Sequence, residues 1–176
     1  MKTAIRILIV IIPLFAFQLG SFNPRKARDI KAIEASLDSI SLAGLRLSGL
    51  KLFSTTERDV YAKVGKPDSI SIFVDECGDR GEFKRLHYGK DVLYTHKGKL
   101  YDFDIATARF KIDYQQIKVG DPRDKIRRLF PKSYEERFEK GADNQTIDIQ
   151  IDIYDSYLKI FVDKNKVTGF MTWEPC

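Results

Sequence analysis

The chain is poor in the residues on which much protein chemistry depends. Its 176 residues include two cysteines, two histidines and one tryptophan. Two cysteines are too few for a disulfide-built scaffold, and 11 glycines with 6 prolines exclude a collagen-like or low-complexity chain. Because 43% of the residues are hydrophobic, the composition also differs from that of a disordered protein. The length allows one domain with a substantial core, or two small units that share one.

Common catalytic and metal-binding motifs are missing. The sequence has no Gly-x-Ser-x-Gly, no His-Glu-x-x-His, no glycine-rich phosphate loop and no Cys-x-x-Cys. The acidic cluster within residues 75–82 lacks the spacing of a calcium-binding loop. His87 and His96 are expected on one face of a hairpin, about 13 Å apart, which is too far for one zinc ion. We therefore expect no enzyme and no catalytic, metal-binding or cofactor-binding residues. A hydrolase with dispersed carboxylates is the alternative, since separation in space is not visible in a sequence.

The first 20 residues have the pattern of a secretory signal peptide. Lys2 and Arg6 precede an unbroken apolar run from Ile7 to Phe17, and Gly20 and Ser21 are small enough for a cleavage site. The run is shorter than the ~20 residues of a membrane-spanning helix. No cysteine lies near the end of the run, so we do not expect a lipoprotein signal. We predict export to the periplasm or the medium, with an uncleaved N-terminal membrane anchor as the alternative.

Export would place both cysteines in an oxidising compartment. Cys77 and Cys176 are 99 residues apart, and a pair in such a compartment is usually a disulfide. The carboxylates beside Cys77 raise a thiol pKa, which disfavours a reactive cysteine. A structural disulfide between the two residues is therefore the prediction.

The basic residues do not form a nucleic-acid-binding pattern. Without residues 1–20 the chain has 28 basic and 25 acidic residues, so its net charge falls from +5 to +3. The densest basic cluster, Lys125, Arg127 and Arg128, lies in one short amphipathic segment and is interpreted as a solvated helix face. We expect no nucleic-acid partner, and membrane contact only through an uncleaved N-terminus.

The spacing of apolar residues predicts an α+β fold with two tandem units. Residues 26–40 have helical spacing, and residues 42–53 favour extended chain. A short capped helix followed by antiparallel strands then occurs twice. The expected strands are 69–74, 82–88, 91–96, 99–105 and 109–112 after the first helix, and 146–154, 157–162 and 167–173 after the second. The expected divisions are a signal peptide (1–20), an N-terminal helix and connector (21–49) and two helix–sheet units (50–113 and 114–176).

The two helices carry a family resemblance. Residues 54–67, STTERDVYAKVGKP, resemble a signature in which Gly and Thr open a short helix, Val follows and Gly-x-Pro closes it. This signature is found in the β-lactamase-inhibitor-protein-like fold and in the small lipoprotein subunit of the outer-membrane β-barrel assembly machine. Residues 120–133 resemble a second copy, and residues 88–100 resemble the central hairpin of that fold. The lipid-bearing Cys is missing, which argues against the lipoprotein itself. The resemblance implies a fold whose relatives bind other proteins with their sheet faces.

Alternation in the last three strands predicts a candidate binding face. Eight side chains point away from the core if the isoleucines of residues 147–153 face the helix and the following residues also face inward: Leu158, Ile160, Val162, Val167, Met171 and Trp173. The eight outward side chains are Asp148, Gln150, Asp152, Tyr157, Lys159, Phe161, Thr168 and Phe170. Aromatic residues among polar ones are typical of a protein interface. Ordinary cross-strand pairs, or a face covered by residues 26–40, explain the pattern equally well. We expect an exported, non-catalytic protein-binding or inhibitor-like envelope domain, with an anchored structural protein as the alternative.

Overall fold

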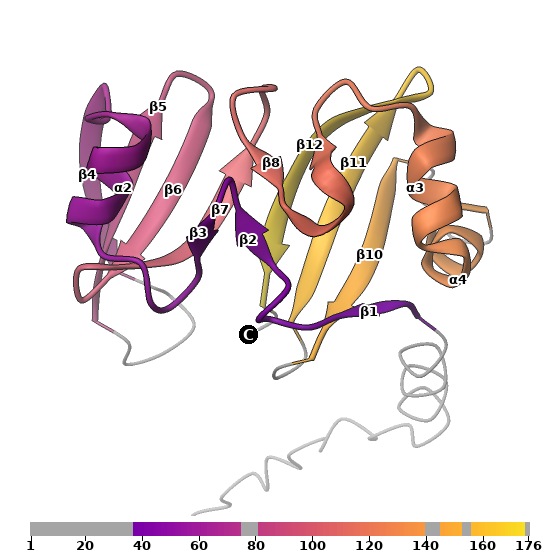
Figure 1. The fold of residues 1–176 in the computed structure, drawn as a ribbon, viewed down its shortest axis with the longest axis horizontal. Helices are drawn as coiled ribbons and strands as arrows, with labels where there is room; N and C mark the ends of the chain where they lie inside the picture. The colour runs from indigo at the N-terminus through magenta and orange to yellow at the C-terminus, as the bar shows by residue number, and fades with distance from the viewer. Residues whose placement is uncertain (1–36, 75–80, 140–144, 153–155, 175–176) are drawn as a thin grey trace, which may run out of the picture.

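The computed structural model describes residues 37–74, 81–139, 145–152 and 156–174, which are coloured in Figure 1. The predicted signal peptide (1–20), most of the predicted N-terminal helix and most of the acidic cluster lie outside these ranges. Cys77 and Cys176 lie outside them as well, so the predicted disulfide stays a prediction.

Most strands of the described chain belong to one large sheet. Its order is β1-β10-β11-β12-β7-β6-β5-β4, and Figure 1 shows it extending across the whole molecule. Every neighbouring pair is antiparallel except β1 and β10, which run parallel. The strands are β1 (Ser39–Ile40), β4 (Ser69–Val74), β5 (Glu82–Tyr88), β6 (Asp91–His96), β7 (Lys99–Ile105), β10 (Thr146–Ile151), β11 (Tyr157–Asp163) and β12 (Lys166–Trp173).

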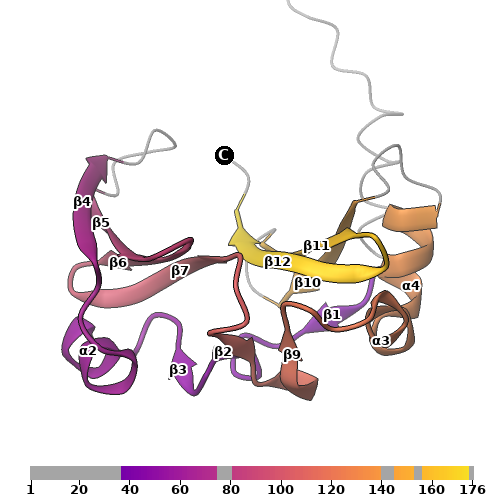
Figure 2. The same cartoon turned by 90° about the horizontal axis from the view of Figure 1, so that it is seen from above.

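A second layer covers one side of this sheet. It contains a small sheet of order β3-β2-β8-β9 and the helices α2 and α3 (Figure 2). The small strands are β2 (Arg46–Leu47), β3 (Leu50–Lys51), β8 (Lys111–Ile112) and β9 (Ile117–Lys118). The helical elements are α2 (Glu57–Val64), the 3₁₀ turn η1 (Tyr114–Gln116), α3 (Arg123–Leu129), α4 (Pro131–Ser133) and the π-helical turn η2 (Tyr134–Glu139). The hydrophobic core fills the space between the two layers, and no helix of the described ranges is long and apolar enough to span a membrane.

The expected α+β fold of two tandem helix-plus-strand units is wrong. Strands hold 49% and helices 20% of the described residues, so the fold is mostly β. β7 pairs with β12 through Ile105–Phe170 and Asp104–Met171, which carries one sheet across the boundary expected near residue 113. β1 comes from the expected N-terminal connector but pairs with β10. The pairing of β7 with β12 satisfies backbone amides and carbonyls that two separate sheets would leave exposed at their edges. The spacing of apolar residues within the two helices carries no information about which strands pair.

The predicted positions of individual strands and of the first helix agree with the structure better than the predicted arrangement of two units does. The predicted ranges 69–74, 82–88, 91–96 and 99–105 are the observed β4, β5, β6 and β7. The first helix is also present, and its N-cap is Thr56. The Thr56 hydroxyl accepts a hydrogen bond from the Asp59 amide at 3.3 Å, and the Asp59 carboxylate accepts one from the Thr56 amide at 3.3 Å. This reciprocal arrangement satisfies two amides at the start of the helix.

Residues 39–40 form a strand, although the spacing of residues 26–40 predicted a helix. Ile40 is buried and lies opposite Ile151 of β10. The Asp38 amide donates to the Ser133 hydroxyl at 2.9 Å, and the Ser133 amide donates to the Asp38 carboxylate at 3.0 Å. These contacts with residues far along the chain override the local helical pattern.

Candidate functional site

The large sheet has a free face, which we define as the face opposite α2 and the small sheet. Figure 2 shows no described helix or strand over the middle of this face, and the β4 end of the sheet bends toward it. Its side chains alternate along each strand with those of the core. On the covered face, Leu86, Leu93, Phe103 and Leu158 are completely buried.

The predicted outward residues divide into those on the free face and those elsewhere. Asp148 lies opposite Lys159, and Gln150 lies opposite Tyr157 across β10 and β11. Thr168 is exposed, and Phe161 is half-buried. Asp152 is different, because its carboxylate accepts a hydrogen bond from the Leu42 amide at 2.7 Å and is held at the β1 edge of the sheet.

The predicted orientation of β12 is wrong after Val167. Val162 lies opposite Val167, but Phe161 lies opposite Gly169, so Thr168 is an extra residue in a β-bulge. One extra residue moves every following side chain to the other face. Phe170 is therefore completely buried, with its ring 6.0 Å from that of Phe103, and is not part of the binding face. Met171 and Trp173 lie on the free face instead of in the core.

A β4–β7 aromatic cluster occupies the first half of the free face. We define it as Phe73, Phe83, His96 and Tyr101. Phe83 stacks on the His96 ring at 4.4 Å, and its ring centre lies 5.4 Å from that of Phe73 and 5.2 Å from that of Tyr101. The Arg85 guanidinium lies 4.1 Å above the Phe73 ring. The sequence analysis missed this cluster, although alternation within residues 69–96 was the signal that could have found it.

A β11–β12 aromatic cluster occupies the second half. We define it as Tyr157, Lys159 and Trp173. The Tyr157 and Trp173 rings are 5.9 Å apart, and the Lys159 ammonium lies 4.1 Å above the Trp173 ring. The same ammonium is 3.9 Å from the Asp148 carboxylate. A cation over an aromatic face is favourable, and it fixes the orientation of a ring that is otherwise exposed.

A small central hollow of about 40 Å³ lies between the two clusters, where β7 and β12 diverge. Its walls include Leu52 and Phe53 of the second layer as well as Tyr101, Asp102, Thr172 and Trp173 of the large sheet. Burial raises the pKa of the Asp102 carboxyl to about 8, against a hydrogen bond from the Phe103 amide that lowers it. The Thr172 hydroxyl is buried and has no hydrogen-bond partner among the described residues. The hollow therefore offers polar groups inside an aromatic rim.

The two histidines lie where the hairpin predicted. His96 is opposite Phe83 and His87 is opposite Val92, so the two histidines share one face of the hairpin as expected and lie at different ends of the ladder. The Nε2 atom of His87 is 3.0 Å from the Ser71 hydroxyl, and the Nδ1 atom of His96 is 3.2 Å from the Glu82 carbonyl oxygen. Within the described ranges, no three His, Cys, Asp or Glu residues are grouped as metal ligands.

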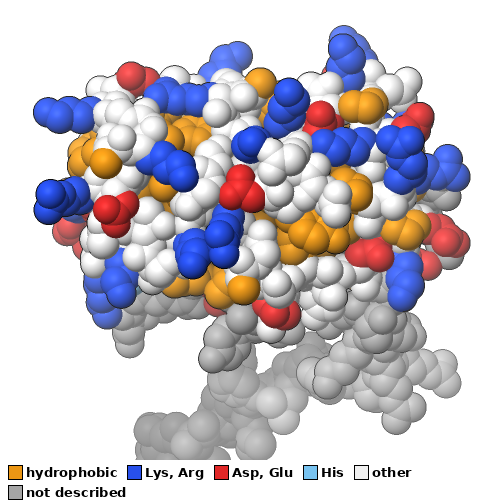
Figure 3. All heavy atoms as spheres, viewed as in Figure 1, with side chains coloured by type: hydrophobic (Ala, Val, Ile, Leu, Met, Phe, Trp, Pro, Cys, Tyr) orange, Lys and Arg blue, Asp and Glu red, His pale blue; other side chains and the backbone are white. Residues whose placement is uncertain are grey.

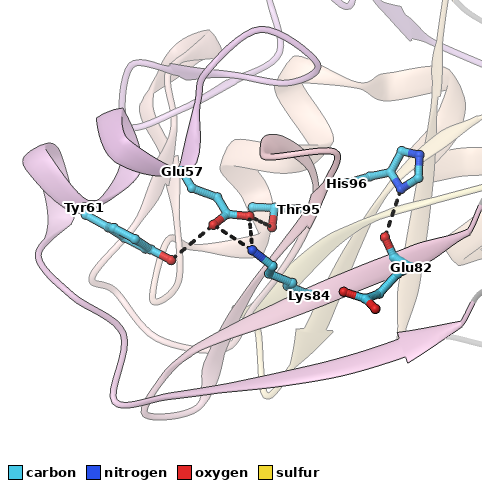
Figure 4. A network of polar contacts seen from close by, with 6 residues as sticks. All are labelled: Glu57, Tyr61, Glu82, Lys84, Thr95 and His96. Carbon is cyan, nitrogen blue, oxygen red and sulfur yellow. Dashed lines mark hydrogen bonds and ion pairs between the residues drawn. The ribbon is translucent and has the colours of Figure 1, made fainter.

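A polar network on the covered face attaches α2 to the large sheet (Figure 4). The Glu57 carboxylate accepts hydrogen bonds from the Thr95 hydroxyl at 2.7 Å, the Lys84 ammonium at 3.2 Å and the Tyr61 hydroxyl at 3.4 Å. Burial raises the pKa of Tyr61, and the neighbouring Glu57 charge adds to the effect. Because these donors already satisfy the carboxylate, we interpret the network as structural.

The covered side carries a different surface. Figure 3 shows lysines and arginines spread around this side, with acidic and apolar groups between them. Comparison with family models, with curated proteins and with solved structures gives no match for the chain. The function is therefore inferred from the residues of the free face.

Proposed function

We propose that this chain is an exported, non-catalytic domain that binds another protein through the free face of its large sheet. The observation that carries the proposal is the presence of two aromatic clusters on a sheet face whose middle no described helix or strand covers. Aromatic and arginine side chains supply most of the energy at protein interfaces.

The strand pairing supports a preorganised interface. Both clusters lie on paired strands, and their rings are fixed by stacking and by cations, so binding would order few additional side chains. A smaller loss of side-chain entropy leaves more of the contact energy for affinity. Arg85 and Lys159 place cations in the two halves, and Asp102 and Asp104 place carboxyl groups near the centre. A partner with acidic groups flanking a central hydrogen-bond donor would complement this pattern.

The proposal also uses the sequence. The resemblance of residues 54–67 is to proteins whose relatives bind other proteins with sheet faces, and the pattern of residues 1–20 supports export. A mature N-terminus near residue 21 or 22, measured by mass spectrometry of the exported chain, would support cleavage. An intact N-terminus would instead support the membrane anchor.

Site-specific photo-crosslinking in intact cells tests the binding face. A photoreactive residue at the exposed Thr168 lies in β12 of the large sheet, next to the Phe161–Gly169 pair, whereas the same residue at the exposed Arg128 lies on α3 of the covering layer and serves as the control. We expect one specific adduct from position 168 and none from position 128. Combining Phe161→Ala with Trp173→Ala should reduce the adduct by about tenfold or more, because each ring is an interface anchor.

Two results would contradict the proposal. The first is equal crosslinking from positions 168 and 128. The second is an adduct that persists unchanged when Phe161 and Trp173 are both alanine. The melting temperature of the double variant shows whether a lost adduct reflects binding or unfolding.

A further inference from the structure

The edge strand β4 exposes an apolar row. Ile70, Ile72 and Val74 have 51%, 60% and 69% of their surface exposed, the largest values among the exposed large hydrophobic residues of the described chain. They alternate with Ser71 and Phe73, and Ile70 lies opposite the buried Leu86, so all three side chains lie on the covered side of the sheet.

β4 also lacks the features that usually protect an edge strand. Natural edges are shortened, bulged or charged, because their unpaired amides and carbonyls would otherwise pair with another chain. β4 has six residues, none charged and none proline, and its register with β5 is uninterrupted from Ser69–His87 to Val74–Glu82. The opposite edge, β1, has only two residues. Within the described residues, β4 is therefore a long edge strand able to accept a further strand.

We propose that β4 pairs antiparallel with β4 of a second copy of this chain, which forms a two-fold symmetric dimer. Opposite residues of an antiparallel pair lie on the same face, so the register that joins the apolar rows places Ile72 opposite Ile72 and Ile70 opposite Val74 of the partner copy. A strand that pairs with itself makes a closed, isologous contact. The dimer thus uses up the long edge of each copy and does not extend into a filament.

The symmetry of the apolar row and the lack of charge on β4 favour a second copy as the occupant. Ile70 and Val74 lie two residues on either side of Ile72, so two copies of the row match each other when the strands run antiparallel. The strands that meet at the axis carry no charge of their own, so identical copies do not repel each other there.

The dimer does not depend on the proposed binding function. The apolar row lies on the covered side, so pairing at β4 leaves the free faces of both copies open on the same side of one continued sheet. The two proposals can therefore fail separately. Loss of the dimer would leave the crosslink at Thr168, and loss of that crosslink would leave the dimer.

Sedimentation velocity over a concentration series, with the purified exported protein, tests the dimer. We expect the mass to double with increasing concentration. Ile72→Lys should weaken association by about tenfold or more, since two lysines would then lie directly opposite each other. Thr168→Lys adds the same charge on an exposed position of β12 and should leave association unchanged. A monomer at all concentrations, or a dimer that survives Ile72→Lys, would overturn the proposal.

Cysteine substitution tests the register independently of affinity. Ile72→Cys should form a covalent dimer on mild oxidation, because the two residues 72 face each other at the axis. Ser71→Cys, one residue away on the other face, should crosslink far less, since its expected neighbour is Phe73. Equal crosslinking of the two variants, measured against the unsubstituted chain, would also overturn the proposal. Circular dichroism confirms that each variant is folded before its result is interpreted.

Discussion

Gly169 lies where the two halves of the large sheet join, and its replacement by alanine should weaken that junction. A Cβ atom at this position would lie 2.8 Å from the backbone carbonyl oxygen of Ile105 in β7. A carbonyl in a paired strand cannot rotate away as a side chain can. β12 must therefore move away from β7 beside Ile105–Phe170 and Asp104–Met171, the two residue pairs that connect these strands.

The size of the effect follows from this contact. Ordinary van der Waals contacts of a Cβ atom begin at about 3.4 Å, so the strands must separate locally by about 0.6 Å. Overpacking of this kind costs about 1–3 kcal/mol in free energy of unfolding. We expect Gly169→Ala to fall in this range. Thr168→Ala, at the exposed neighbouring position, should change stability by less than about 0.5 kcal/mol.

Urea unfolding followed by tryptophan fluorescence measures this difference. Trp173 is the single tryptophan of the chain, and it lies beside the junction, so its emission reports on the strands that move. Amide hydrogen exchange should also become faster in residues 103–105 and 170–172 of the Gly169→Ala variant. A Gly169→Ala variant as stable as Thr168→Ala would refute the argument, since it would mean that β12 approaches β7 less closely than the structure shows.

Two further predictions concern the central hollow. Thr172→Val removes a buried hydroxyl that has no partner among the described residues, so the free energy of unfolding should rise by about 1 kcal/mol in urea titrations; a loss of stability would show that the hydroxyl is satisfied. Asp102→Asn should change the pH dependence of stability. Folding raises the pKa of the Asp102 carboxyl from 3.8 to about 8, so this carboxyl loses its proton at a lower pH in the unfolded chain than in the native protein. The free energy of unfolding therefore falls as the pH rises between these two values. Asp102 can lower the free energy of unfolding by at most about 1.4 kcal/mol for each pH unit, and the Asp102→Asn variant should lack this contribution. Equal slopes for the two proteins, from melting curves between pH 4 and pH 8, would contradict the raised pKa.

The alternation of apolar and polar residues predicted much of the strand structure. It placed β4 to β7 correctly, and it identified Ile147, Ile149 and Ile151 as core residues, which the structure confirms. The hairpin expected around His87 and His96 is also present, formed by β5 and β6. These features depend on neighbouring residues, and a strand's period of two is visible over a few positions.

The candidate face was predicted only in part, and the bulge at Thr168 explains the error. Strict alternation places Phe170 outward and Trp173 inward, but the extra residue reverses both. A bulge has no marker in a single sequence as clear as the alternation that it interrupts. Gly169 was the available hint, because glycine inside a strand often indicates a bulge or a close approach of another backbone.

The sequence by itself determined where most strands lie, which of their side chains are apolar and where α2 ends, because each is set by residues a few positions apart. Only the tertiary structure decided that β7 joins β12, that β1 pairs with β10, and which sheet face is left free. The hydrogen bonds of strand pairing come from the backbone, which all residues share, so distant partners are chosen by how the whole core packs. A local pattern cannot contain that choice.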